Sequence, residues 1–550
     1  MLEPEVERAL TTKRRMGHRP KHRSAAAAAA VLVVGGLLAA CSSTGSAGST
    51  SAPASAASSG TAASASPSAA AETPQMGGIL RVGGSGGGPS DTVDPHNTLL
   101  GTDTARAYML YDQLVKMADT GESQLVLAES ITPNADATEW TIKIKPDVRF
   151  HDGTTLTADD IMWNFKRILD NKFPGASALG PIDIDASKVV DDTTLTLKFT
   201  EPYSTLIDNL ALYFFGVIPQ NWTPENPVGT GPFKFQSFTP GTESTFVRND
   251  DYWNPGLPYL DAIVFTDVAD ETAQVNGLQS GQFDAVNFLS AASATVLEGS
   301  GLQVVKSKTG GFVPFLMKVD TEPFDDVRVR EAFKLIVNRQ QMLDAVFSGF
   351  GQIGNDISSP FDPAYDQSIP QRTQDIAKAK ELLKAAGQEN MSIDLYTSVG
   401  AGSGAVAMAQ VFATQAKEAG VTVTVKEQAP TDYFENSYKK VPFSMEYWQA
   451  LPYANMASQA FLPTSPWNAT LRDDPEYNAL YAELSKTVDT ARQTEIIQEM
   501  MQMDYDTGGM IIPFFLPIID AYGPTVRGVH ESVTGLSPGG NDWANMWMAS

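Results

Sequence analysis

The architecture of this chain is indicated most clearly by the stretch Phe150-His151-Asp152-Gly153-Thr154-Thr155-Leu156-Thr157-Ala158-Asp159-Asp160. His151-Asp152-Gly153 has the composition of a turn between a strand and a helix, because aspartate and glycine both favour tight turns. Thr157 then offers a hydroxyl as a helix cap, and Asp159 and Asp160 supply acids in the first turn. The stretch therefore predicts a turn followed by the start of a helix.

The sequence on both sides supports this interpretation. Apolar residues recur at helical spacing after the cap, at Ile161, Phe165, Ile168 and Leu169. Apolar and polar residues alternate over 140–144 and 195–199, which is typical of strands with one buried face. One amphipathic helix between strands of a small sheet is therefore expected.

Other segments continue the same mixture. Helices are predicted over 329–337 and 379–386, and strands over 79–82 and 421–425. The apolar run 510–519 is too short to span a membrane and is interrupted by Pro513 and Pro517, so it is interpreted as a buried strand or hinge. The fold class predicted is α/β.

The first 40 residues have the composition of an export signal. Seven basic residues precede an uncharged stretch over 25–40, and no basic stop signal follows it. Ala39 and Ala40 stand before Cys41, the only cysteine of the chain, and resemble the lipobox of bacterial lipoproteins. That resemblance implies a signal peptide over residues 1–40 and a lipid on Cys41, which would anchor the protein on the extracytoplasmic face of the cell membrane. Arg14-Arg15 leaves the export route open, and an unmodified signal peptide ending in cysteine is the alternative.

Residues 41–75 are predicted to be a disordered tether. They consist almost entirely of Ser, Ala, Gly, Thr and Pro, which bury too little apolar surface to offset the entropy of ordering. A flexible coil of this length has an end-to-end distance on the order of 30 Å. The roughly 475 residues that follow exceed what one core accommodates, so two or three lobes are expected.

Charge and metal-ligand content exclude several partners. The formal net charge is −25, and it becomes −29 when residues 1–40, with seven basic and three acidic groups, are removed. A nucleic acid is not expected as a partner, because its phosphates reward clustered cations. With Cys41 acylated no thiol remains for zinc, and His96, His151 and His530 are too far apart in sequence to form a local ligand pair. No metal and no cofactor are expected.

Enzyme motifs are few. Gly83-Gly84-Ser85-Gly86-Gly87 matches the G-x-S-x-G pattern of hydrolases, but that motif needs a helix directly after the serine, which Gly88-Pro89 would obstruct. Two interpretations remain for this segment: a flexible loop, or a backbone that approaches a ligand closely at Ser85. Neighbouring acidic pairs such as Asp325-Asp326 are interpreted as turn or cap residues. We therefore expect no enzyme activity.

The stretch 150–160 resembles the signature of the bacterial family 5 extracellular solute-binding proteins, the oligopeptide, dipeptide and nickel binding group. Four further blocks are similar to those of that family in the same order: Tyr111-Asp112-Gln113-Leu114, Val228-Gly229-Thr230-Gly231-Pro232-Phe233, Arg248-Asn249-Asp250-Asp251-Tyr252-Trp253 and Pro323-Phe324-Asp325-Asp326-Val327-Arg328-Val329-Arg330-Glu331-Ala332. The resemblance extends from residue 77 to the C-terminus. Most of these residues also have a plain structural role in turns and caps, so we expect them to be scaffold.

The resemblance implies a periplasmic-binding-protein type II fold, with two lobes that close around a solute and a small accessory domain. The implied boundaries are 76–120, 225–308 and 515–550 for lobe I, 121–224 for the accessory domain and 309–514 for lobe II. Hinge crossings are expected near residues 308 and 515. The implied partners are a small solute and the permease and ATPase subunits of an ABC importer, and a monomer is expected.

The ligand class is less clear, because peptide-binding relatives typically carry an aspartate three residues after a tryptophan, where it pairs with the peptide ammonium. Here Leu451 stands three residues after Trp448, and the segment 396–408 lacks the arginine that dipeptide binders use for the carboxylate. An unpaired buried ammonium is costly. An oligopeptide or dipeptide is the family default, and an oligosaccharide or a modified peptide is the alternative.

Most of the candidate ligand-binding residues lie near Leu451 in the sequence. Aromatic faces can stack on sugars or hold apolar side chains, although ordinary core packing is the alternative for each ring. The predicted ligand-binding residues are Ser85, Tyr447, Trp448, Leu451, Tyr453, Trp467 and Asn468. Two other classes of function remain open: an exported hydrolase, and a surface receptor or chaperone for a protein partner.

Overall fold

The structure is a computed structural model that describes residues 72–98 and 101–550. The predicted leader, the lipid attachment site Cys41 and residues 41–71 of the predicted tether lie outside these residues. Residues 72–550 form one compact unit in which helices and strands are mixed, so the α/β prediction is confirmed. Within the described residues, no helix has both the length and the apolar character that a membrane crossing needs.

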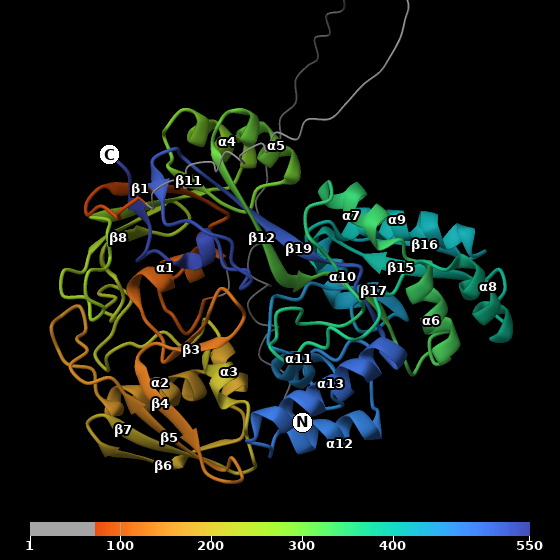
Figure 1. Cartoon of the computed structure of the whole chain (residues 1–550), viewed down its shortest axis with the longest axis horizontal. Helices are drawn as coiled ribbons and strands as arrows, with labels where there is room; N and C mark the ends of the chain where they lie inside the picture. The colour runs from red at the N-terminus through yellow and green to blue at the C-terminus, as the bar shows by residue number, and fades with distance from the viewer. Residues whose placement is uncertain (1–71, 99–100) are drawn as a thin grey trace, which may run out of the picture. The chain divides into compact units, whose positions relative to one another are not determined.

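The largest sheet has eight strands, in the order β12-β19-β11-β1-β10-β9-β8, with β14 paired to β19 (Figure 1). Its strands are β1 (Ile79–Ser85), β8 (Phe233–Thr239), β9 (Glu243–Arg248), β10 (Ala262–Val268), β11 (Ala285–Val286), β12 (Gln303–Phe312), β14 (Gln352–Ile353) and β19 (Phe514–Tyr522). The predicted strand over 79–82 is β1, which pairs in parallel with β10 and β11. Three helices pack against this sheet: α1 (Gly101–Leu110), α4 (Glu271–Gln279) and α5 (Ala291–Gly299).

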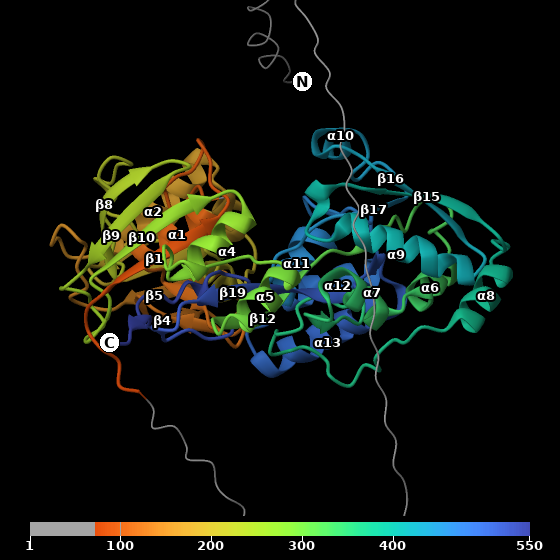
Figure 2. The same ribbon diagram turned by 90° about the horizontal axis from the view of Figure 1, so that it is seen from above.

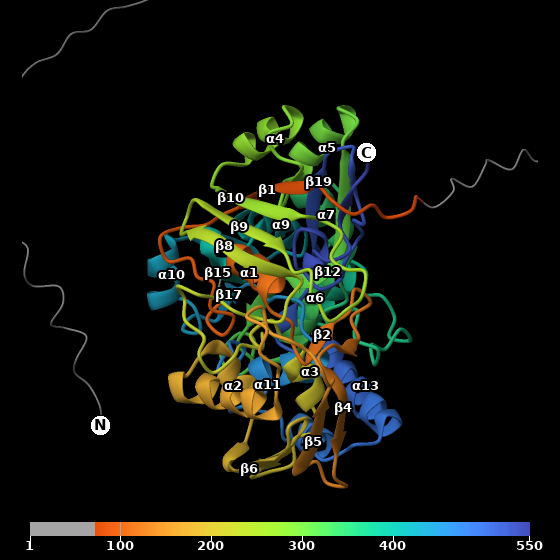
Figure 3. The same ribbon diagram turned by 90° about the vertical axis from the view of Figure 1, so that its left-hand side faces the viewer.

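The four-stranded sheet is antiparallel, in the order β4-β5-β7-β6. Its strands and the two helices near it are β4 (Ala128–Pro133), β5 (Glu139–Ile144), β6 (Ile182–Asp191), β7 (Thr194–Phe199), α2 (Ala158–Asn171) and α3 (Leu206–Leu210). The alternation over 140–144 buries Trp140, Ile142 and Ile144, as predicted. The predicted helix is α2, which packs against β6 and β7. Figure 3 shows α2 in the same part of the molecule as β6. At the start of this helix, Asp160 Oδ2 accepts the Thr157 N–H over 3.0 Å and the Thr157 hydroxyl over 2.8 Å.

Residues 313–513 build a helix-rich region around two small sheets. Its strands are β13 (Phe315–Met317), β15 (Ser392–Thr397), β16 (Thr422–Glu427), β17 (Phe443–Met445) and β18 (Met510–Ile511). Its helices are α6 (Val327–Ile336), α7 (Arg339–Phe347), α8 (Ile376–Ala385), α9 (Ala405–Glu418), α10 (Pro430–Asn436), α11 (Tyr453–Ala460), α12 (Pro475–Leu484) and α13 (Thr490–Thr507). The predicted helices over 329–337 and 379–386 and the strand over 421–425 are confirmed as α6, α8 and β16. Asp326 caps α6, because its side chain accepts the Arg328 N–H over 2.8 Å.

Two long strands connect the large sheet to this region. β12 and β19 pair antiparallel from Gln303 opposite Tyr522 to Phe312 opposite Phe515, and Figures 1 and 2 show them side by side. The chain enters residues 313–513 after β12 and returns through β19. The run 510–519 thus forms β18 and most of β19, which confirms the prediction of a buried strand.

The stretch 150–160 is held to the glycine-rich block 228–233 by one side chain. The Gly229 N–H donates to His151 Nδ1 over 3.2 Å, and His151 Nε2 donates to Gly231 O over 3.0 Å. Burial lowers the pKa of His151 to about 4, so the imidazole is neutral and can make both bonds. A Cβ on Gly229 would lie 2.1 Å from Leu110 O, so only glycine fits there.

A buried carboxylate joins three further motifs. Asp112 accepts hydrogen bonds from Tyr252 Oη over 3.0 Å and from Trp253 Nε1 over 2.6 Å. Thr230 Oγ1 lies 3.4 Å from the same carboxylate. These four residues come from the three blocks 111–114, 228–233 and 248–253, so the blocks meet at one junction and act as scaffold, as expected.

Candidate functional site

A cavity of about 690 Å³ lies beside the paired strands β12 and β19. Its walls come from parts of the sequence that lie far apart: α1, α4, α7, α9, β12, β19 and the loops over 211–213, 288–291, 447–450 and 534–537. The volume falls in the range typical of small-molecule sites. The cavity is therefore the candidate ligand site of this protein.

Three tyrosines from three separate segments line this cavity. Tyr108 comes from α1, Tyr213 from the loop after α3, and Tyr447 from the segment after β17. Among the described residues, none of the three hydroxyls forms a hydrogen bond with the protein. Burial raises the pKa of Tyr213 to about 12, with a further contribution from Tyr447, so its hydroxyl is neutral at physiological pH. Each hydroxyl can donate to and accept from a bound solute.

The cavity wall is almost free of charge. Glu271, the first residue of α4, is the one charged side chain among the described residues that line it. The Glu271 Oε1 accepts the Ser290 N–H over 2.7 Å. Burial opposes ionisation of this carboxyl, but hydrogen bonds from Ser293 and Ser290 outweigh it and hold the pKa of Glu271 below its usual value. The carboxylate is therefore ionised at neutral pH.

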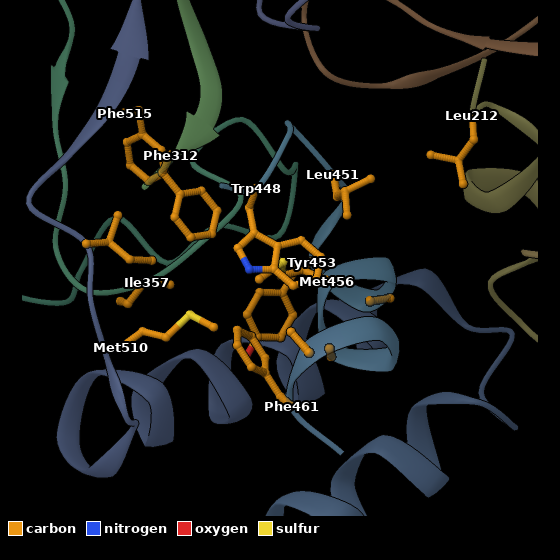
Figure 4. Close-up of a cluster of buried hydrophobic side chains, with 14 of the residues drawn as sticks. Leu212, Phe312, Ile357, Trp448, Leu451, Tyr453, Met456, Phe461, Met510 and Phe515 are labelled. Carbon is orange, nitrogen blue, oxygen red and sulfur yellow. The ribbon is translucent and has the colours of Figure 1, made fainter. Parts of the chain in front are cut away.

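Tyr447 and Trp448 point to opposite sides of an extended segment. Trp448 pairs with Phe312 of β12 through two backbone hydrogen bonds of 2.9 Å. Because side chains alternate along such a segment, Tyr447 and Gln449 line the cavity while Trp448 turns into the hydrophobic core (Figure 4). The Trp448 indole donates to Glu446 Oε1 over 2.8 Å, and burial raises the pKa of Glu446 to about 7.

Two further predicted ligand residues lie in the same core (Figure 4). Leu451 is only 6% exposed and lines a separate void of about 20 Å³ together with the buried carboxyl of Asp362. Tyr453 is fully buried, and its hydroxyl donates to Asp504 Oδ2 over 2.6 Å. Both side chains are thus committed to packing and internal hydrogen bonds outside the wall of the main cavity.

The remaining predicted residues also lie outside that wall. Trp467 is 50% exposed, with Lys439 Nζ 5.9 Å from its ring centroid. Asn468 is buried and holds its own loop, since its side chain donates to Arg472 O over 2.8 Å and accepts the Arg472 N–H over 3.1 Å. Ser85 ends β1, and its N–H donates to Asn287 Oδ1 over 2.7 Å.

The geometry of a hydrolase or of a metal centre is not formed at these positions. Residues 86–98 after Ser85 contain no helix, so the turn that a G-x-S-x-G nucleophile needs is missing there. In residues 72–98 and 101–550, no three His, Cys, Asp or Glu side chains are grouped so that they could hold a metal ion.

Sequence reasoning missed most of the cavity wall. Gln449 could have been found from the period-two alternation around Trp448. Tyr108, Tyr213 and Glu271 carry no local signal. Contacts between segments that lie far apart in the sequence bring them to the cavity, and periodicity does not encode such contacts.

Comparison with known proteins gives a consistent result. Residues 122–469 match the sequence profile described as bacterial extracellular solute-binding proteins, family 5, middle. The oligopeptide-binding protein AppA of Bacillus subtilis is 30% identical over 339 residues, which cover 58% of this chain and 61% of that protein. The chain thus spans about three fifths of the curated relatives that it matches first.

Solved structures show the same fold. AgaA from A. tumefaciens R10, solved with agropinic acid, has a TM-score of 0.70 and 25% identity, covering 86% of this chain and 99% of its own. The ABC transporter substrate-binding protein CtaP from Listeria monocytogenes has a TM-score of 0.75 and 20% identity, covering 86% of this chain and all of its own.

Proposed function

Because the chain belongs to the bacterial extracellular solute-binding proteins of family 5, we propose that it captures a solute outside the cell for an ABC importer. The observation that carries this proposal is the cavity of about 690 Å³, whose wall presents three tyrosine hydroxyls without protein partners. Unpartnered polar groups in a largely apolar cavity are the usual means of orienting a small ligand. The permease and ATPase subunits of the importer are the proposed partners.

The proposed domains follow the boundaries implied by the sequence: 76–120, 225–308 and 515–550 for lobe I, 121–224 for the accessory domain and 309–514 for lobe II. The pairing of β12 with β19 supports a hinge near residues 308 and 515, where the chain passes between the two lobes. In this proposal the cavity wall combines residues of all three parts, and a solute that touches both lobes favours the closed state by binding it more tightly than the open one.

The proposed ligand is a peptide or a solute of similar size. The names of the relatives support an oligopeptide, a dipeptide or a tripeptide. The tyrosines of the wall suit an oligosaccharide or a modified peptide equally, because their rings can stack and their hydroxyls can hydrogen-bond. Leu451 stands where peptide binders typically carry an aspartate, but its side chain lies outside the wall of this cavity, so it does not decide between these ligands.

The proposed location is the extracytoplasmic face of the cell membrane, with a lipid on Cys41. Intact mass measurement of the protein from its host membrane tests this: a diacylglycerol on Cys41 and loss of residues 1–40 are expected. A Cys41→Ala variant should be released from the membrane fraction. Retention of that variant in the membrane would refute the lipid anchor.

Native mass spectrometry of the purified full-length protein, followed by thermal-shift titration with peptide and oligosaccharide panels, tests solute capture. A ligand at 100 times its dissociation constant should stabilise the protein by about 2.7 kcal/mol. Turnover of a bound probe would instead identify a hydrolase. Specific capture of a secreted protein, with no response to any small solute, would identify a receptor or chaperone.

A further inference from the structure

The charge of the cavity wall is strongly one-sided. Among the described residues that line the cavity there is one carboxylate, Glu271, and no lysine, arginine or histidine. A solute carboxylate therefore meets no cation in this wall, whereas a solute cation meets one anion. This asymmetry bears on which solutes the cavity can hold.

Glu271 is not neutralised by the protein. No described lysine, arginine or histidine forms an ion pair with it, and its hydrogen bonds come from the uncharged Ser290 and Ser293. The side chain is partly exposed, so water solvates its charge while the cavity is open. A ligand that displaces this water must replace its interactions, and a cationic group does so best.

An exposed aromatic ring lines the same cavity as this carboxylate. Phe288 stands two residues before Ser290, lines the cavity and is 40% exposed. Its φ of +53° lies in the left-handed region, which is rare for a bulky side chain. The segment is fixed on both sides, since Asn287 Oδ1 accepts the Ser85 N–H and the Leu289 N–H donates to Ile519 O over 2.9 Å.

Such a ring adds to the preference for a cation. The face of an aromatic ring carries negative charge and attracts ammonium and guanidinium groups. Tyr108, Tyr213 and Tyr447 contribute three more rings to the same wall, with hydroxyls that suit an uncharged polar body. Among its described residues the wall thus offers one carboxylate and several aromatic faces, and no cationic side chain.

We propose that the cavity selects solutes that carry a single positive charge and no carboxylate, and that Glu271 pairs with the cationic group. This inference rests on the proposed capture of a solute and names the solute's class: an amine, guanidinium or quaternary ammonium on an uncharged body. A zwitterionic peptide is disfavoured, because its carboxylate would lose water without gaining a cation and would share the cavity with Glu271.

Isothermal titration of the full-length protein with four forms of one tripeptide, Ala-Phe-Ala, separates the two charges. The forms combine a free or acetylated N-terminus with a free acid or an amide at the C-terminus. The free-amine amide should bind best, and acetylation should weaken binding by on the order of tenfold to hundredfold. Maltotriose and its reductively aminated form repeat the comparison of amine with neutral group on a sugar body.

The variant Glu271→Gln assigns the amine effect to this residue. Glutamine keeps an oxygen that can accept the Ser290 N–H, so a purely structural role of Glu271 would leave the amine preference intact. Glu298→Gln is the matched control, because it removes the same charge from the exposed pair of Glu298 with Lys306 on α5 and β12. The amine preference should disappear in Glu271→Gln and persist in Glu298→Gln.

Three results would overturn the inference. They are equal or tighter binding of the acetylated or free-acid forms, an amine preference that survives in Glu271→Gln, and no binding of any cationic probe. A neutral or anionic probe that binds as tightly as the matching cationic probe would overturn it while leaving solute capture intact. Failure of solute capture itself is recognised separately, by the absence of any response in the native mass and thermal-shift tests.

Discussion

Replacing His151 by alanine should destabilise the junction between the stretch 150–160 and the block 228–233. The imidazole makes two hydrogen bonds to this block, one from the Gly229 N–H and one to Gly231 O. The variant leaves both backbone groups without their partners. At this partly exposed position we expect each loss to cost about 1–2 kcal/mol, or about 2–4 kcal/mol of unfolding free energy in total at pH 7.

The same bonds predict how this cost depends on pH. Burial lowers the pKa of His151 from its usual 6.5 to about 4 in the folded state. Because the folded-state pKa is the lower one, the neutral imidazole contributes stability above pH 6.5, and this contribution is lost as the pH falls towards 4. The difference between the two pKa values corresponds to about 3 kcal/mol of unfolding free energy. Most of the extra stability of the wild type over His151→Ala should therefore vanish near pH 4.

Urea unfolding of the full-length protein, followed by tryptophan fluorescence at pH 7 and pH 4.5, measures both effects. His530→Ala is the matched control, since His530 is an exposed ring paired with Asp119 and its pKa is raised by that hydrogen bond. The control should change stability by less than about 1 kcal/mol. Equal stability of His151→Ala and wild type at pH 7, or a difference that does not shrink at pH 4.5, would refute the reasoning.

Three further substitutions test other parts of the structure. Gly229→Ala should lower the unfolding free energy by about 1–3 kcal/mol in urea titrations, because its Cβ would lie 2.1 Å from a backbone oxygen. The control Gly299→Ala should not destabilise the protein, because the space around its Cβ is open. The stability of Glu446→Gln relative to the wild type should rise by about 3 kcal/mol between pH 4.5 and pH 7 in thermal unfolding. The reason is that burial raises the pKa of the Glu446 carboxyl to about 7, so the stability that its protonated form contributes is present at low pH and is lost as the pH rises. An unchanged pH profile would contradict this. Tyr213→Phe should leave the melting temperature unchanged, because the hydroxyl has no partner among the described residues, but should weaken ligand binding about twofold to tenfold in calorimetry; equal loss of stability and affinity would argue against a direct contact.

Local structure was predictable because its causes are local. The helix after Thr157 follows from a cap and apolar residues at helical spacing, and the strand over 140–144 follows from strict alternation. A turn or cap was expected at Asp325-Asp326, and Asp326 is the residue that caps α6. Each of these depends on residues within one or two turns, so no knowledge of distant contacts was needed.

The cavity shows the limit of such reasoning. The aromatic residues around Trp448 form one group in the sequence, but they separate in space, because alternate side chains of an extended segment face opposite sides. Tyr447 reaches the cavity, while Trp448 and Tyr453 fill the core. Only the pairing of this segment with β12 decides which of its side chains face the cavity and which face the core.

The sequence by itself determined the α/β class, the family and the positions of turns, caps and strands, because these depend on short-range periodicity and on motifs that are contiguous in the chain. The tertiary structure alone decided that His151 joins two distant motifs and that Glu271 shares a cavity with Tyr108, Tyr213 and Tyr447. These groupings arise where β12 and β19 bring distant segments together, and the free energy of such contacts depends on distances in space that no local pattern of residues specifies.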